Sequence, residues 1–124
     1  MPHLTIQATP NVSISNEESF LKSLNKVLWD SGHFRKKTDI KARILPMKTF
    51  LVGVEDDEQE NGFIYANLKI MTGRHLDIRN QLAELLVATI EDKLIEEQSG
   101  RVALQICVEV ENGNGVYHKK MLGS

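Results

Sequence analysis

The chain carries the same order of patterned segments twice, and this repetition limits the folds that it can adopt. Apolar residues alternate with polar ones in four segments, as in half-buried strands, and recur at helical spacing in two others. The expected strands are residues 2–8, 40–45, 63–71 and 102–110, and the expected helices are residues 16–31 and 76–97. Aligning Pro2 with Ile64 also aligns Asn11-Val12 with Gly73-Arg74. We therefore predict internal repeats at about residues 2–54 and 63–111, followed by a tail at 112–124.

Local signals support several of these boundaries. Ser15 with Glu18 three residues later fits a capping box at the start of the first helix. Gly32 fits the C-cap of that helix, because glycine adopts the left-handed conformation at little cost. The apolar run 49–54 predicts another short strand. An acidic loop is expected from Glu55 to Gly62, with Asn61-Gly62 as a turn.

The order of the segments predicts the topology. Two strands that flank a crossover helix pair in parallel, so each repeat is expected to form a strand–helix–strand unit. At 124 residues the chain is expected to be a single α/β (α+β) domain, with a four-stranded sheet and two helices on one face. The other face would be open and mixed in character. Its expected residues are His3, Thr5, Gln7, Lys41, Arg43, Tyr65, Asn67, Lys69, Gln105 and Cys107. A binding site or a subunit interface would explain this face, so we expect an oligomer.

Composition argues against several classes of protein. The formal net charge is −2, with 15 basic and 17 acidic residues, so we expect no nucleic-acid partner. One cysteine, Cys107, fits a reducing compartment. No apolar stretch approaches the roughly 18 residues of a membrane span, and no signal-peptide pattern is present. The four histidines lack metal-ligand spacing. We therefore expect a cytoplasmic protein without a metal or other cofactor.

Pro2 is the first candidate for chemistry. Removal of Met1 would leave a secondary amine at the start of a strand. An amino terminus has a pKa of about 7.7–8.0, and a prolyl amine starts higher. Burial and neighbouring cations would lower that pKa toward the range of a useful general base. Alternatively, Pro2 merely follows the initiator methionine, as in many proteins.

The duplicated unit with Pro2 at its front resembles the tautomerase superfamily, and within it the 5-carboxymethyl-2-hydroxymuconate isomerase family. The stretches that carry the resemblance are Met1-Pro2-His3, Asp39-Ile40-Lys41-Ala42-Arg43 and Leu68 to Arg74. The resemblance covers roughly residues 2–111. It implies a tautomerase-like fold and a homotrimer with sites near the subunit boundaries. It also implies a proline base, with arginines that hold substrate carboxylates.

Carried over by position, the resemblance makes Pro2 and Arg74 catalytic, and Arg43 and Lys41 substrate-binding. The family strand usually reads Arg-x-Arg, whereas this chain has Lys41-Ala42-Arg43. Lysine keeps the positive charge but cannot bind a carboxylate through two parallel N–H groups, as arginine does. The identity of the substrate is therefore left open. Arg74 could instead be solvated or paired with Asp77, and Lys41 and Arg43 could form a basic strand face or interface salt bridges.

Two functions of different classes follow. The first is a cofactor-independent isomerase of aromatic-compound catabolism that moves a proton on an unsaturated di- or tricarboxylate. The second is a non-catalytic oligomeric α/β module that binds a small ligand. Retention of Met1 would favour the second, because the nitrogen of Pro2 would then be an amide and not a base.

Overall fold

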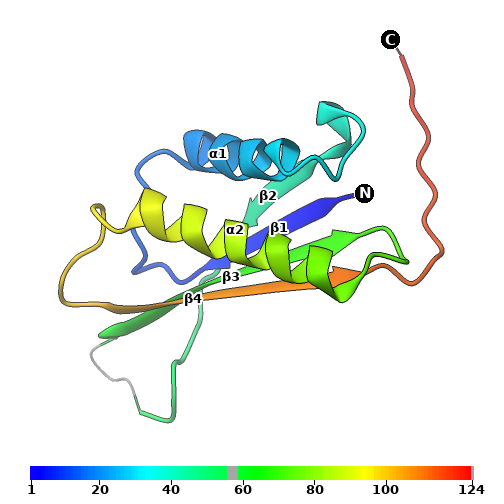
Figure 1. Ribbon diagram of the computed structural model, residues 1–124. Helices are drawn as coiled ribbons and strands as arrows, with labels where there is room; N and C mark the ends of the chain where they lie inside the picture. The colour runs from blue at the N-terminus through cyan, green and yellow to red at the C-terminus, as the bar shows by residue number, and fades with distance from the viewer. Residues whose placement is uncertain (56–58, 124) are drawn as a thin grey trace.

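The computed structural model describes residues 1–55 and 59–123, in which both helices cover one face of a four-stranded sheet (Figure 1). The strands are β1 (His3–Ala8), β2 (Lys41–Leu45), β3 (Asn61–Ile70) and β4 (Ala103–Asn112). The helices are α1 (Glu17–Asp30) and α2 (Leu76–Leu94), and a short 3-10 helix, η1 (Lys37–Asp39), precedes β2. The predicted fold class is confirmed.

The sheet consists of two parallel pairs joined at its centre, with the strand order β2-β1-β3-β4. In β1–β2 and in β3–β4 the strands run parallel, as expected for strands joined through a helix. The central strands β1 and β3 are antiparallel, with Leu4 opposite Leu68 and Ile6 opposite Ala66. The two halves thus have the predicted strand–helix–strand form, while their origin by duplication stays a prediction.

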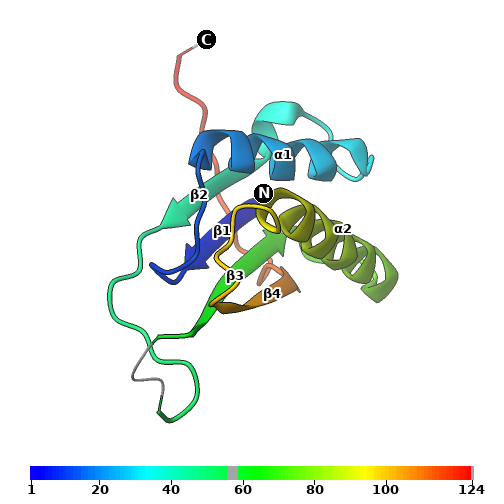
Figure 2. The ribbon, with the colours of Figure 1, turned by 90° about the vertical axis from the view of Figure 1, so that its left-hand side faces the viewer.

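The core lies between the sheet and the two helices, which Figure 2 shows on the same side of the strands. Alternate residues of β1 and β3 point into it, and the apolar stripes of α1 and α2 close it from the other side. Its most deeply buried side chains include Leu4, Ile6, Leu24, Leu28, Ile64, Leu68, Leu82, Leu86 and Ile90. The polar residues between the inward-pointing ones therefore occupy the opposite face of the sheet.

The start of α1 differs from the prediction by one residue. Asn16, not Ser15, is the N-cap, and its side-chain oxygen accepts a hydrogen bond from the backbone N–H of Ser19 at 2.9 Å. Ser15 is held by Glu97, whose carboxylate accepts both the Ser15 N–H and the Ser15 hydroxyl. That long-range contact removes Ser15 from the capping role. Gly32, just beyond the C-cap, has the predicted left-handed conformation (φ +82°).

Two further predictions were wrong. Residues 49–54 form no strand, and Leu51 and Val54 are exposed. Asn61-Gly62 does not form a turn but begins β3, where it pairs with the start of β4. Of the predicted acidic loop, residues 56–58 lie outside the described part of the chain. The second helix also ends at Leu94, earlier than the expected residue 97.

Neither helix of the described residues is long and apolar enough to cross a membrane.

Gly62 leaves space for a polar cluster that joins the turn after β1 to β3. A Cβ atom there would lie 2.6 Å from Asn11 Oδ1 and 2.8 Å from Thr9 Oγ1. These atoms already hydrogen bond to each other, and the Asn11 amide donates to the carbonyl of Asn61.

We predict that Gly62→Ala lowers the free energy of unfolding by about 1–3 kcal/mol, because it overpacks and disrupts this cluster. Urea denaturation at a fixed protein concentration measures the change. Gly100→Ala is the matched control, since a Cβ atom at Gly100 meets nothing within 4 Å. Equal stabilities of the two variants would contradict the prediction.

Candidate active site

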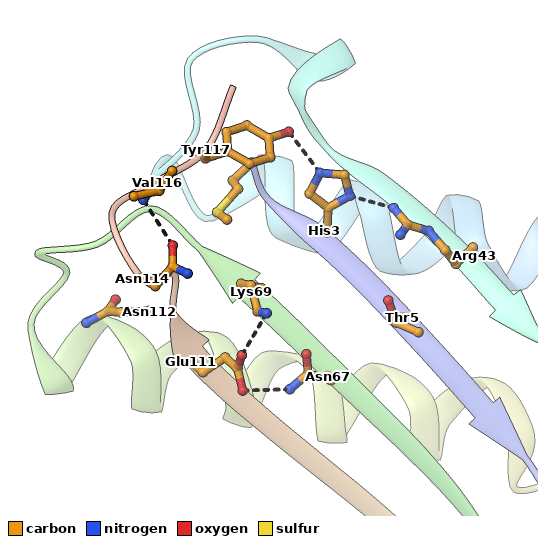
Figure 3. A pocket seen from close by; sticks show the side chains of 11 residues that line it. His3, Thr5, Arg43, Asn67, Lys69, Glu111, Asn112, Asn114, Val116 and Tyr117 are labelled. Carbon is orange, nitrogen blue, oxygen red and sulfur yellow. Dashed lines mark hydrogen bonds and ion pairs between the residues drawn. The ribbon is translucent and has the colours of Figure 1, made fainter. Parts of the chain in front are cut away.

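Two cavities adjoin the amino terminus, and Met1 lines both of them. The first, of about 500 Å³, lies on the face of the sheet that the helices leave open (Figure 3). The second, of about 420 Å³, lies between the end of α1 and the start of α2, and includes Arg74. The Met1 residue thus forms a common wall between them.

The first cavity, called here the sheet cavity, contains Arg43. Arg43 lies opposite Thr5 in the β1–β2 pair, so both side chains point to the open face. Its guanidinium donates from Nη2 to His3 Nδ1 at 2.5 Å. His3 Nε2 lies 2.9 Å from the hydroxyl of Tyr117, which belongs to the tail after β4 (Figure 3). The sheet cavity therefore combines residues from β1, β2 and the tail.

The same cavity also holds Lys69 at the end of β3. Its Nζ forms an ion pair with Glu111 at 3.2 Å, and Glu111 also accepts a hydrogen bond from Asn67. Lys69 is thus partly neutralised by its own neighbour, whereas Arg43 contacts an uncharged imidazole nitrogen. Arg43 is therefore the better group of the two for holding an anion.

Arg74 lies in the second cavity, called here the helix cavity. The turn before it passes through Gly73 at φ +92°, a conformation that favours glycine. Arg74 Nη2 donates to the carbonyl of His33 at 2.6 Å, and its guanidinium lies 5.8 Å from the centre of the Phe34 ring. The ion pairs among the described residues do not include Arg74 with Asp77. A guanidinium just before a helix amino terminus can bind a carboxylate together with free backbone N–H groups.

Lys41 lines neither cavity. Its Nζ donates to the carbonyl of Asp39 at 2.6 Å, and Lys119 of the tail forms an ion pair with the Asp39 carboxylate at 3.0 Å. Burial, followed by the charge of Lys119, lowers the pKa of the Lys41 ammonium below its usual value. Lys41 therefore contributes a positive charge near the terminal amine without lining the sheet cavity.

Pro2 is buried at the start of β1, and its carbonyl accepts the backbone N–H of Lys41 at 3.2 Å. The prediction of a proline fixed by the sheet is therefore consistent with its contacts. With Met1 attached, the terminal amine is that of Met1. Burial is the largest cause that lowers the pKa of this amine, followed by the charges of Lys41 and Lys119, while Asp39 opposes them.

The four predicted residues are thus only partly brought together. Arg43 lines the sheet cavity and Arg74 the helix cavity, each together with Met1, whereas Pro2 and Lys41 line neither cavity. Sequence reasoning missed Tyr117 and Lys119, because their tail has no periodic pattern and their partners are remote in sequence.

Other chemical candidates contribute little to either cavity. Cys107 is half-buried on the open face, outside the lining of both cavities. Within residues 1–55 and 59–123, no cluster of three or more His, Cys, Asp or Glu side chains could hold a metal ion.

Comparisons with known proteins identify the fold and the family of the chain. The fold is similar to a 5-carboxymethyl-2-hydroxymuconate isomerase from Deinococcus radiodurans R1, with a TM-score of 0.83 and 24% identity over 97% of this chain and 90% of that chain. A 5-carboxymethyl-2-hydroxymuconate delta-isomerase gives a TM-score of 0.80 and 17% identity, over 98% and 88% of the two chains. A fused 4-OT wild type symmetric trimer gives a TM-score of 0.61 and 14% sequence identity, over 87% of this chain and 84% of that chain.

These identities establish the fold alone, and no curated protein sequence matches the chain significantly. The family model for 5-carboxymethyl-2-hydroxymuconate isomerase, in contrast, matches residues 2–121, which is nearly the whole chain. The chain therefore belongs to the 5-carboxymethyl-2-hydroxymuconate isomerase family.

Proposed function

We propose that this isomerase moves a proton on an unsaturated dicarboxylate or tricarboxylate, with the amine of Pro2 as the general base. Removal of Met1 frees that amine. It takes a proton from a carbon near a carbonyl or enol group, and the resulting prolinium returns the proton at another carbon of the dienolate. Arg74 and Arg43 hold the carboxylates, and the positive charge of Lys41 adds to the stabilisation of the developing negative charge.

The observation that carries this proposal is the position of Met1. Because Met1 lines both cavities, its removal opens the space between them at the nitrogen of Pro2. The amine would then lie between a cavity that contains Arg43 and one that contains Arg74. A base between two carboxylate receptors suits a substrate with charged groups at both ends and an acidic carbon between them.

The electrostatic surroundings favour a neutral amine. Burial and the cations Lys41 and Lys119 lower the pKa of the Met1 amine, and the Pro2 amine would take a place next to the same groups. A lower pKa gives more of the unprotonated base near neutral pH.

The proposed assembly is a homotrimer. One of the similar folds is a symmetric trimer, and this chain leaves one sheet face without helices (Figure 1). Large apolar side chains are also exposed at Leu45, the last residue of β2, at Leu51 and Val54 after β2, and at Met121 and Leu122 in the tail. Contact between subunits would cover such surfaces.

The proposed substrate class follows from the two family members of solved structure, which are named for 5-carboxymethyl-2-hydroxymuconate. These names support the proposal that the reaction belongs to the breakdown of aromatic compounds. Lys41 stands where the family usually has an arginine, which binds a carboxylate differently. The substrate of this chain therefore need not match 5-carboxymethyl-2-hydroxymuconate at every carboxylate group. The family membership favours this enzymatic proposal over a non-catalytic ligand-binding module.

We predict that Pro2→Ala lowers kcat/KM for 5-carboxymethyl-2-hydroxymuconate by about 10- to 100-fold, because the primary amine of alanine is not fixed by a ring and a well-positioned general base contributes about 100-fold or more. Absorbance measures the isomerisation, and intact mass measures the fraction without Met1. Pro10→Ala, in the exposed turn after β1, is the control and retains activity. Equal activity of protein with and without Met1 would refute the role of Pro2.

We predict that Arg74→Ala and Arg43→Ala each lower kcat/KM by about 10- to 100-fold, since each removes a charge-assisted hydrogen bond to a carboxylate. Arg101→Ala is the control, because it removes an exposed arginine outside both cavities. Sedimentation must show the same assembly for all three variants. Losses no greater than that of Arg101→Ala would rule out carboxylate binding.

We predict that Lys119→Met shifts the acid limb of the kcat/KM profile to higher pH. The cation disfavours prolinium, so its removal raises the pKa of Pro2, and the release of Asp39 from its ion pair acts in the same direction. Values of kcat/KM measured across pH 5–9 locate the midpoint of the acid limb, which does not depend on their absolute size. Lys120→Met is the control, and an unshifted or lower midpoint in Lys119→Met would contradict the mechanism.

A further inference from the structure

The tail after β4 is attached to the site at several points. The backbone N–H of Gly113 donates to the carbonyl of Ile70 at 2.7 Å, and within the tail itself the side-chain oxygen of Asn114 accepts the N–H of Val116 at 3.0 Å. Further along, Lys119 pairs with Asp39. These contacts direct the segment between them back past the amino terminus, and they place the Tyr117 ring edge-on to His3, with centroids 5.7 Å apart (Figure 3).

The hydrogen bonds around His3 determine which atoms donate. Arg43 has only donors, so His3 Nδ1 must accept its hydrogen bond with a lone pair. A neutral imidazole then carries its hydrogen on Nε2, and this N–H donates to the oxygen of Tyr117 at 2.9 Å. Burial, followed by the cations Arg43 and Lys41, lowers the pKa of His3 and favours this neutral form. The Tyr117 hydroxyl can therefore direct its own hydrogen toward a third group.

The sheet cavity is where that third group would lie. Tyr117, His3 and Arg43 all line it, and the Tyr117 oxygen and the Arg43 guanidinium are held on either side of one imidazole ring (Figure 3). Two donors on the same wall of a cavity can bind the oxygens of one carboxylate. Lys69 adds positive charge, although Glu111 partly neutralises it.

We propose that Tyr117 of the tail is a substrate-binding residue that donates its hydroxyl hydrogen to the same carboxylate that Arg43 holds, and that His3 is the positioning residue between them. This inference rests on the proposed function, and it specifies how one end of an anionic substrate is recognised. The tail then completes the sheet cavity and limits which carboxylates fit.

Binding of adipate tests the proposal without requiring catalysis, because this dicarboxylate has no double bond to move. Calorimetry on the full chain without Met1 measures its Kd. We expect Tyr117→Phe to raise the Kd about tenfold, as for loss of a hydrogen bond to a charged group. Tyr65→Phe is the matched control, since Tyr65 donates to Glu109 outside the cavity, and we expect its Kd to equal that of the parent.

The role of His3 is tested by two substitutions. His3→Asn keeps a short acceptor for Arg43, whereas His3→Leu keeps none, so adipate should bind more tightly to His3→Asn. Nitrogen chemical shifts of His3 in the parent should show the hydrogen on Nε2. Equal affinities of the two variants, or a hydrogen on Nδ1, would overturn the positioning role.

The outcomes separate this inference from the proposed function. If the parent binds adipate through Tyr117 but does not isomerise unsaturated carboxylates, the proposed function fails and the binding site stands. If the parent isomerises them while Tyr117→Phe and Tyr65→Phe bind adipate alike, or if the parent does not bind adipate, the role of Tyr117 is overturned.

Discussion

The antiparallel pairing of β1 with β3 is the interaction on which the rest of the structure depends. Each half of the chain makes a parallel strand pair with its own helix, but a two-stranded half has too little sheet to cover that helix. Pairing the central strands places Leu4 and Ile6 beside Ala66 and Leu68 in one buried layer, against which both helices pack. Because β1 begins at His3, the same pairing fixes the amino terminus at the end of the sheet.

The alternation that builds the core also builds the open face. Successive side chains of a strand point to opposite sides, so the buried leucines and isoleucines require Thr5, Asn67 and Lys69 to point away from the helices. Polar groups from all four strands are thereby collected beside the amino terminus. The sheet cavity lies among these groups.

Positive charge is distributed around the amino terminus in a way that serves two purposes. Arg43 and Arg74 lie in separate cavities and can receive anionic groups. Lys41 and Lys119 are instead tied to Asp39, where they influence the pKa of the terminal amine. A cation that is already engaged by a protein carbonyl or carboxylate can act at a distance without occupying the space of the substrate.

Local patterns in the sequence predicted the four main strands, the two helices and the parallel pairs, whereas the family resemblance supplied the candidates Pro2, Arg74, Arg43 and Lys41. Periodicity is a property of neighbouring residues, so it predicts strands, helices and the residues that share a face. It could not predict that Glu97 displaces Ser15 from the cap, that Gly62 sits within a strand, or that Tyr117 reaches His3. Those features depend on contacts between residues distant in the chain, and only the tertiary structure brings such residues together.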